Sequence, residues 1–379
     1  MNDSSMAPLR SWLAAPLDRD VSEALERLRR APDVQQIAVM PDVHLAAEVC
    51  IGVVVATSNL IYPQAVGGDI GCGMLAVAVD AEAAALENPK TAAHLLNEIG
   101  RAVPARRRNR NAAISQPAEI ANEPLSDASL EAIRQREGAI EFATLGSGNH
   151  FLELQADEEG RLWLMVHSGS RALGPAIRDH HLARAQLVEG RLRALDAQSD
   201  AGQEYLHDAR WARRFADASR KAMAEEAGTV LTRTLKCGIA WETMIVTDHN
   251  HVALERHGVR ELWVHRKGAM SAQQGQPGVL PGSMGSASFH VEGRGCEEAL
   301  CSSAHGAGRA LSRSAARSRF SDRELQRQME GVWYDYRLTG KLRDEAPAAY
   351  KDIRAVLRAQ RELVKVIRTL RPVLNYKGV

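Results

Sequence analysis

Several features that would narrow the class of this 379-residue chain are missing. It carries 48 lysines and arginines against 47 aspartates and glutamates, so a formal net charge of +1 gives no clue to function. Aromatic residues make up 4% of the chain, too few for a platform on which nucleic-acid bases stack. No apolar run approaches the roughly 18 residues of a membrane span, and no secretory signal opens the chain. We therefore expect a cytoplasmic protein without a membrane partner.

Cysteine and lysine are also scarce. The five cysteines are odd in number and irregularly spaced, which argues against a disulfide framework and leaves metal binding or nucleophilic chemistry for any important thiol. Only eight of the 48 basic residues are lysine, so 40 are arginine, an excess that we attribute to a GC-rich genome rather than to phosphate binding. The apolar share of 45% and the charged share of 25% exclude a disordered chain.

Hydrophobic periodicity predicts both strands and helices. Alternation and β-branched residues predict strands at 36–40, 51–57, 74–79, 151–155, 162–166, 243–247 and 261–265. Helical spacing predicts helices at 21–30, 88–99, 126–140, 174–195, 203–234, 306–318 and 350–369. The order is not a regular βα alternation, and no Walker or Rossmann glycine loop is present. We expect a mixed α/β (α+β) fold in which residues 1–35 form a partly helical extension and 36–379 a single catalytic domain.

A glycine-rich turn at 67–74 is the most informative local feature. Its glycines surround Asp69 and Cys72 and let the backbone bend tightly, so that both side chains can reach one point. A carboxylate beside a thiolate suits manganese or zinc better than magnesium or calcium, because the harder ions avoid sulfur. The alternative is a glycine-rich turn that holds a buried, inert cysteine.

Two histidines flank a predicted hairpin and favour the metal hypothesis. If residues 157–160 form the turn, His150 lies directly opposite His167, with Cβ atoms about 5 Å apart. A slip of one residue would turn one imidazole away, so this prediction depends on the turn. His249 and His251 follow another predicted strand, and their spacing leaves open which would be a ligand. The pair His180 and His181 lies among charges in a predicted helix, where we expect both to be solvated.

The segment 302–309 predicts a turn that leads into a helix. His305 would stand at the helix start, where free N–H groups attract an anion, and Arg309 and Arg313 would extend that site along one helical face. His305 could be a general acid, a metal ligand or a nucleophile that attacks phosphorus. The structural alternative is a histidine that caps the helix through a hydrogen bond to the backbone. Residues 281–288 offer hydroxyls and backbone amides for a nucleotide, though such strings are more often plain loops. The basic run 106–110 is typical of a solvated loop.

Taken in order, these segments resemble the RtcB family of RNA ligases. The resemblance covers the chain from about residue 37 onward, and the matching blocks are 40–44, 69–74, 148–151, 167–171, 249–250, 265–269, 281–288, 303–309, 344–347, 350–352 and 377–378. It implies an RtcB-like fold built around a dinuclear centre, with two Mn²⁺ ions per chain bridged by Cys72. His167 and His249 would complete one ion, and Asp69 and His150 the other. The family ligand is the histidine before Asn250, which selects His249 over His251.

The resemblance also implies that His305 accepts GMP from GTP. The implied guanine-nucleotide pocket consists of Asn149, Glu153, Asn250, Pro281, Gly282, Ser283, Met284, Ser288, Gly306, Ala307, Gly308, Tyr350 and Lys377. GMP would pass to an RNA 3′-phosphate, which arises from a 2′,3′-cyclic phosphate where necessary, and a 5′-hydroxyl would then attack and expel GMP. Arg171, Arg309 and Arg313 are our candidates for holding RNA phosphates.

One departure bears on the substrate rather than on the reaction. After Asp42-Val43-His44, where many relatives have Gly-Lys-Gly, this chain has Leu45-Ala46-Ala47-Glu48 and so exchanges a positive charge for a negative one. We expect a monomer that acts in RNA repair rather than in housekeeping tRNA splicing, with an accessory activating protein as a possible partner. The alternatives are a manganese-dependent phosphodiesterase or cyclic phosphatase that opens RNA ends without joining them, and a non-catalytic RNA-binding protein.

Overall fold

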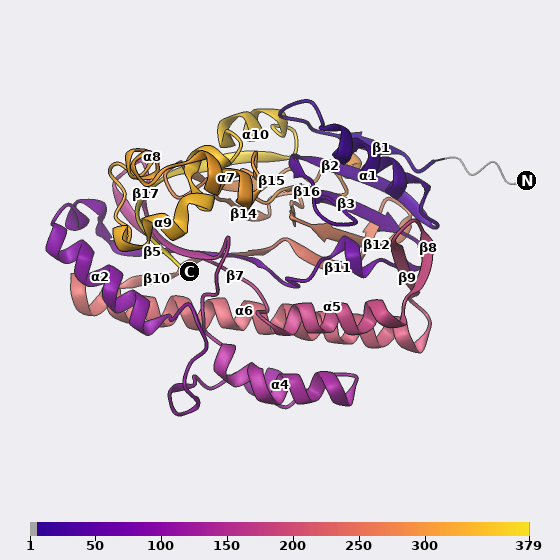
Figure 1. Ribbon diagram of the computed structural model, residues 1–379, viewed down its shortest axis with the longest axis horizontal. Helices are drawn as coiled ribbons and strands as arrows, with labels where there is room; N and C mark the ends of the chain where they lie inside the picture. The colour runs from indigo at the N-terminus through magenta and orange to yellow at the C-terminus, as the bar shows by residue number, and fades with distance from the viewer. Residues whose placement is uncertain (1–5, 379) are drawn as a thin grey trace, which may run out of the picture.

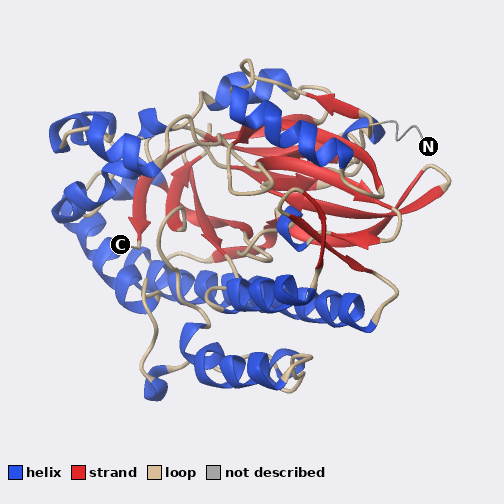
Figure 2. Ribbon diagram, turned by 45° about the vertical axis from the view of Figure 1, so that its right-hand side comes forward, coloured by secondary structure: helices blue, strands red, loops and turns tan. Residues whose placement is uncertain are grey.

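The computed structural model describes residues 6–378 and confirms the prediction of a mixed α/β fold. Strands occupy the middle of the molecule, and helices lie above and below them (Figures 1 and 2). The α-helices are α1 (Arg19–Arg30), α2 (Pro89–Ala102), α3 (Ala118–Ala121), α4 (Ala128–Glu141), α5 (Leu173–Arg184), α6 (Asp200–Leu235), α7 (Arg313–Arg319), α8 (Asp322–Gln328), α9 (Thr339–Leu342) and α10 (Ile353–Ala359). No helix among the described residues is both long and apolar enough to cross a membrane.

The strands form four sheets, of which two dominate. In chain order the strands are β1 (Leu9–Ser11), β2 (Val34–His44), β3 (Ile51–Thr57), β4 (Leu60–Ile61), β5 (Gly73–Glu82), β6 (Phe151–Ala156), β7 (Arg161–Ser168), β8 (Gln186–Glu189), β9 (Leu192–Asp196), β10 (Ile239–Asp248), β11 (Asn250–His257), β12 (Arg260–Lys267), β13 (Ala269–Ser271), β14 (Pro277–Leu280), β15 (Ser288–Gly293), β16 (Ser302–Ala304) and β17 (Val364–Lys377). The five-stranded sheet has the order β1-β2-β3-β12-β11, and the seven-stranded sheet has the order β10-β5-β7-β6-β17-β15-β14. The two small sheets are the pair β13-β16 and the three strands β4-β9-β8.

Continuous apolar runs in β2 and β3 explain why the five-stranded sheet is buried on two faces there. In β2 and β3, Ala38 and Val54 pack into one apolar cluster, while Val39 and Val53 pack into another on the opposite face. Successive side chains of a strand point to opposite sides, so a continuous apolar run can serve two cores at once. The largest core lies between the seven-stranded sheet and the helices α2, α5 and α6.

Helix α6 is the longest element, with 36 residues, and runs along one side of the molecule beneath the sheets (Figure 1). Its first turn is capped by Ser199, whose hydroxyl accepts a hydrogen bond from the amide of Gly202. Its middle carries Arg220, which is wholly buried and donates to the carbonyl oxygens of Gly71 at 2.7 Å and Ser168 at 2.8 Å. The helix therefore supports the glycine-rich turn directly.

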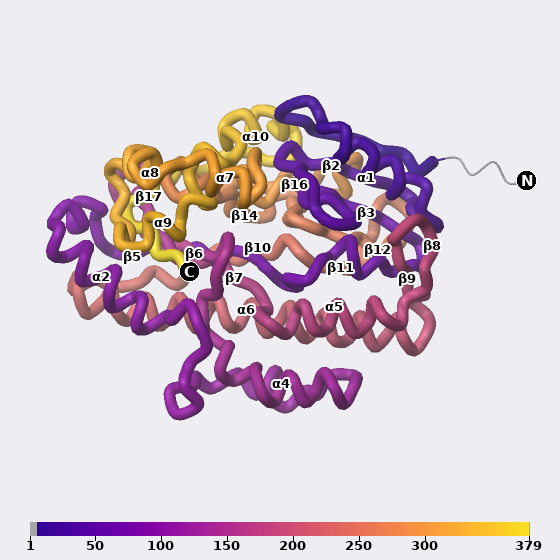
Figure 3. The backbone as a smooth tube through the Cα atoms, in the orientation of Figure 1, coloured from indigo at the N-terminus to yellow at the C-terminus, as the bar shows by residue number. Residues whose placement is uncertain are grey.

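The last strand lies inside the seven-stranded sheet rather than at its edge. β17 pairs with β6 on one side and with β15 on the other, and the yellow end of the tube enters the middle of the molecule (Figure 3). A helix over 350–369 was predicted here, and that prediction is wrong beyond α10. Val364, Val366 and Thr369 are β-branched, and insertion between two strands gives their backbone groups partners.

Two other helix predictions are wrong in part. The predicted helix 174–195 ends at Arg184, and its second half forms the β8–β9 hairpin, which turns at Gly190 with a φ of 55°. The predicted helix 306–318 is confined to α7, which starts at Arg313 after the cap Ser312. Residues 6–35 contain β1, α1 and the start of β2 at Val34, and β1 pairs in parallel with β2 of the five-stranded sheet. The proposed division after residue 35 stays a prediction.

Candidate active site

The glycine-rich turn leads into β5 at the junction of the sheets. A Cβ on Gly71, whose φ is 71°, would lie 2.7 Å from the Cα of Arg213 in α6, so only glycine allows the turn to approach the helix this closely. Asn250 holds the turn from the other side: its side-chain amide donates to the carbonyl of Asp69 at 3.0 Å, and its oxygen accepts from the amide of Gly268 at 2.8 Å. Asp69 and Cys72 are thereby fixed relative to β11 and β12.

A first group of metal-ligating atoms combines Asp69, Cys72 and His150, which come within 4.8 Å of one another. The Nε2 atom of His150 lies 2.9 Å from a carboxylate oxygen of Asp69 and 3.5 Å from Sγ of Cys72. The thiol and imidazole are buried, and one third of the Asp69 side chain is exposed. One oxygen, one sulfur and one nitrogen ligand thus converge.

A second group combines the same Cys72 with His167 and His249. The Nε2 atom of His167 lies 3.2 Å from Sγ of Cys72, and the rings of His167 and His249 are 5.3 Å apart at their centroids. His167 donates from Nδ1 to the carbonyl of Asn149 at 3.0 Å, which leaves the lone pair of Nε2 directed at the thiol. The two groups share Cys72, as expected for a bridging thiolate between two ions.

The register of the β6–β7 hairpin differs by one residue from the prediction. The backbone amide of Asp157 donates to the carbonyl of Arg161, so the turn has three residues, and Phe151 rather than His150 lies opposite His167. Gly160 supplies the left-handed residue of this turn, with a φ of 84°. His150 still meets His167, with ring centroids 5.3 Å apart, because it precedes β6 and escapes the alternation of the strand.

Electrostatics and donor chemistry agree with a transition-metal site. Burial lowers the pKa of His167 and His249 well below the ordinary value, so both are neutral imidazoles with free lone pairs. Burial and the charge of Asp69 raise the pKa of the Cys72 thiol, a bias that a bound dication would reverse. Nitrogen, sulfur and carboxylate ligands together fit manganese or zinc.

His305 lies beside this centre, at the end of β16. Its ring centroid is 4.6 Å from that of His249, and its Nδ1 atom is 2.7 Å from a carboxylate oxygen of the fully buried Asp42. The prediction that a helix starts at His305 is wrong. Gly308 has a φ of 70°, and a Cβ there would lie 2.4 Å from the backbone oxygen of Asp42, so residues after His305 wrap around Asp42.

A cavity of about 270 Å³ opens next to His305. Every residue of the predicted nucleotide pocket lines it except Asn250, which holds the glycine-rich turn instead. The residues that the structure adds to this lining are His44, Ile51, Met74, Phe151, Glu345 and Asn375. Most residues of this wall could be predicted from the sequence because they lie in the blocks that resemble the family.

Glu153 is a buried carboxyl in the wall of this cavity. It accepts hydrogen bonds from the side-chain amides of Gln155 at 2.6 Å and Asn375 at 2.5 Å. Burial raises its pKa to about 7, against which these two amides and Lys377 work. A carboxyl group that titrates near neutral pH thus faces a pocket large enough for a purine.

Glu345 gathers the cations of the cavity. It forms ion pairs with Lys377 at 2.7 Å and Arg309 at 3.2 Å, contacts Arg313, and accepts from the hydroxyl of Tyr350 at 2.6 Å. Burial opposes ionisation of Glu345, but Lys377 and Arg313 outweigh it and hold its pKa at about 2. Because Arg309 belongs to a loop that bridges to Tyr350, the predicted helical face shared by Arg309 and Arg313 does not exist.

Arg171 lies beside the group formed by Asp69, Cys72 and His150. Its Nη1 atom is 3.2 Å from Nδ1 of His150, and its backbone is left-handed with a φ of 58°. Two arginines of the basic loop are held by the protein itself, since Arg107 pairs with Glu137 at 3.1 Å and Arg108 donates to the carbonyl of Ala102 at 2.6 Å.

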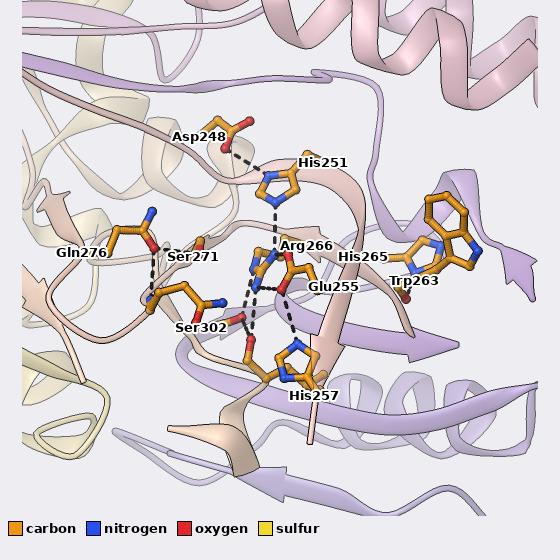
Figure 4. A network of polar contacts seen from close by, with 12 residues as sticks. Asp248, His251, Glu255, His257, Trp263, His265, Arg266, Ser271, Gln276 and Ser302 are labelled. Atoms are coloured by element: carbon orange, nitrogen blue, oxygen red, sulfur yellow. Dashed lines mark hydrogen bonds and ion pairs between the residues drawn. The ribbon is translucent and has the colours of Figure 1, made fainter. Parts of the chain in front are cut away.

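Two further buried histidines, His181 and His251, contact charged side chains and belong to neither group of metal-ligating atoms. His181 was predicted to be solvated, which is wrong: it is fully buried and lies 2.8 Å from Asp208 of α6. His251 contacts Asp248 at 3.1 Å and accepts from Arg266 at 3.1 Å, outside both metal groups (Figure 4).

Sequence reasoning assigned no role to Asp42, although the block 40–44 contains it. The available signal was a carboxylate inside a stretch of otherwise apolar strand, a placement that is costly unless the charge has a partner. The partner proves to be His305, 263 residues away.

Comparison with known proteins decides the family. The model of the family described as tRNA-splicing ligase RtcB matches residues 24–135 and 117–378. This chain belongs to the RtcB family. The RNA-splicing ligase RtcB of Escherichia coli K12 is 39% identical over 404 residues, which cover 98% of either chain. RNA-splicing ligase RtcB1 of Escherichia coli strain ATCC 25922 is 38% identical over 402 residues, again 98% of either chain.

A more distant RtcB relative is similar across nearly its whole length. The RNA-splicing ligase RtcB of Mycobacterium tuberculosis is 29% identical over 418 residues, which cover 89% of this chain and 96% of the relative. The family match spans both metal groups, His305 and the cavity wall of this RtcB-family chain.

Proposed function

We propose that this RtcB-family chain is an RNA ligase that joins a 3′-phosphate or 2′,3′-cyclic phosphate end to a 5′-hydroxyl end at the expense of GTP, in RNA repair. The observation that carries the proposal is His305, which lies between the Cys72 centre and a purine-sized cavity with one ring nitrogen held by Asp42. The curated relatives, named as RNA-splicing ligases, support joining as the reaction.

His305 is the nucleophile of the first step in this proposal. Because Nδ1 lies against the carboxylate of Asp42, Nε2 is the nitrogen left for substrate. Nε2 attacks the α-phosphorus of GTP, the bond to the β-phosphate oxygen breaks, and pyrophosphate leaves. Asp42 stabilises the positive charge that develops on the ring during attack.

Asp69, Cys72 and His150 would hold one Mn²⁺ ion, and Cys72, His167 and His249 the other. When bound, the ions supply positive charge that neutralises phosphate groups and polarises them toward attack. The buried, neutral imidazoles of His167 and His249 suit this role, because protonation would cost them their ligand lone pairs.

Glu153 and Lys377 fit the guanine base. Guanine presents N–H donors at N1 and N2 and an acceptor at O6, so a carboxylate and a cation in one wall match opposite parts of its edge. Asn375 fixes the orientation of Glu153. Adenine, which offers the reverse pattern at its six-position, would leave both groups unpaired.

The later steps transfer GMP from His305 to an oxygen of the RNA 3′-phosphate and break the P–N bond. A 5′-hydroxyl then attacks the 3′-phosphorus, loses its proton and expels GMP. Arg171, Arg309 and Arg313 are proposed to hold RNA phosphates. Of the two arginines that line the cavity, Arg313 is the more accessible to solvent, with 41% of its side chain exposed against 15% for Arg309.

Incubation with α-labelled GTP and Mn²⁺ tests the proposal. Wild type is expected to acquire label in a bond that acid cleaves and base does not, as for a phosphoramidate, and His305→Ala is expected to acquire none. A second assay follows ligation of RNAs with a 3′-phosphate and a 5′-hydroxyl.

The matched control is His290→Ala, which removes a buried histidine of β15 that does not line the cavity. Label that persists in His305→Ala would refute the nucleophile assignment. Opening of a cyclic phosphate without label or joining would identify a phosphodiesterase instead.

A further inference from the structure

A third group of metal-ligating side chains lies at the other end of β11 from His249. His257 ends that strand, eight residues and roughly 26 Å along it. Glu297 begins the single 3₁₀ turn before β16, and Cys301 directly precedes β16. Their ligand atoms lie within 4.8 Å of one another, and His257 and Cys301 are buried while Glu297 is exposed.

The separations within this group fit a tetrahedral ion. Nδ1 of His257 lies 3.0 Å from Oε2 of Glu297, and Sγ of Cys301 lies 3.8 Å from Oε1 of Glu297. Zinc bonds of about 2.1 Å to nitrogen and oxygen and about 2.3 Å to sulfur, at tetrahedral angles, place nitrogen about 3.4 Å and sulfur about 3.6 Å from the oxygen. The two observed separations, each to a different oxygen of Glu297, lie within about 0.4 Å of these tetrahedral values.

A neighbouring carboxylate orients the histidine for this purpose. Oε2 of Glu255 lies 3.3 Å from Nε2 of His257, so a neutral His257 that binds a metal through Nδ1 can donate its Nε2–H to Glu255. Arg266 holds Glu255 in place and also donates to the hydroxyl of Ser302 at 2.9 Å (Figure 4). A ligating histidine typically donates its other ring N–H to a carboxylate in this way.

We propose that His257, Glu297 and Cys301 bind one Zn²⁺ ion, with a solvent molecule on the exposed side of Glu297 as fourth ligand. Mixed nitrogen, sulfur and oxygen ligands favour zinc over the harder Mg²⁺ and Ca²⁺. The ion ties the end of β11 to the segment that continues through β16 into His305. The zinc site lies outside the proposed ligation site, so zinc binding here does not depend on whether the chain is a ligase.

The test uses the full chain with Cys72→Ala, which removes the thiolate of the other centre. Loading with Co²⁺, a spectroscopic substitute for zinc, is expected to give a thiolate-to-metal charge-transfer band. Metal analysis after Zn²⁺ loading and gel filtration should show one ion more than in the Cys72→Ala/Cys301→Ser double variant. Cys296→Ser in the same background is the matched control, because Cys296 belongs to the same turn but not to the ligand group, and it should keep the band.

A second variant decides the matter if Cys301→Ser fails to fold. Glu297→Gln changes an exposed side chain and is expected to weaken Zn²⁺ binding about tenfold or more. Absence of the Co²⁺–thiolate band from the Cys72→Ala protein, or equal zinc content with and without Cys301, would overturn the proposal. The group would then be a protonated histidine between two carboxylates.

Discussion

His249 and His251 stand two residues apart and have opposite surroundings. His249 faces Cys72, His167 and His305, and its pKa is lowered well below the ordinary value by burial and by the neighbouring imidazoles. His251 lies between Asp248 and Arg266, where each ring nitrogen has a charged partner (Figure 4). His249 thus lies among a thiol and other imidazoles, whereas the opposite charges of Asp248 and Arg266 lie on either side of His251. Of these two histidines, His249 is therefore the candidate metal ligand.

His249→Ala should produce the largest effect. Loss of a ligand from the group that faces His305 is expected to lower guanylylation about 1,000-fold or more, which corresponds to about 4 kcal/mol of transition-state stabilisation. Labelling with α-labelled GTP measures the rate, and metal analysis should show less Mn²⁺ per chain. Full activity with normal metal content would remove His249 from the centre.

His251→Ala should change stability instead. Asp248 and Arg266 would each lose a buried partner, and we expect the free energy of unfolding to fall by about 3 kcal/mol, as for a broken buried ion pair. Denaturant titration measures the change, and the variant should retain metal and guanylylation when assayed well below its unfolding midpoint. Loss of metal from a folded His251→Ala protein would erase the contrast with His249.

Asp42→Asn sharpens the comparison at the nucleophile. The amide keeps the shape but cannot stabilise the developing charge on His305, so guanylylation should fall about 100-fold. Asp42 contacts His305 and not the cavity, so the KM for GTP should change little. An unchanged rate would mean that His305 needs no carboxylate partner.

The smallest effect concerns pH. Glu153, whose pKa is about 7, accepts from guanine only as a carboxylate, so guanosine affinity should rise about tenfold from pH 6 to pH 8. Guanosine is preferred to GTP because the terminal phosphate of GTP titrates in the same range. Calorimetry on wild type and Glu153→Gln, which should bind weakly and without pH dependence, checks the assignment. A parallel slope in both proteins would exclude Glu153 as the titrating group.

Local patterns predicted the strands that carry the site better than the segments that close it. The run 51–57 matches the bounds of β3 because its continuous apolar residues serve two cores, a property that is visible in the sequence itself. Residues 364–377 form a strand because they pair with β6 and β15 on either side, and no local sequence pattern contains that information.

Within the candidate site, local glycine-rich patterns indicated the turn at Asp69 and Cys72 and singled out His305, and the family resemblance assigned the role of His305 and most of the pocket wall. The contact between Asp42 and His305 was missed because it joins residues 263 positions apart. The helix expected after His305 was wrong because Gly308 adopts a left-handed conformation against Asp42, a tertiary constraint. Pairing of His150 with His167 was expected for the wrong reason, since the hairpin turn has one residue fewer than assumed.

The interior position of β17 has a consequence for synthesis of the protein. Until residues 364–377 have been made, β6 and β15 each present an open strand edge, and the cavity lacks the wall that Asn375 and Lys377 form. Pairings between strands so distant in sequence form slowly, and open edges meanwhile attract other chains. A chain without residues 364–377 would thus be exposed to aggregation, and the proposed guanine nucleotide would stabilise only chains that contain these residues.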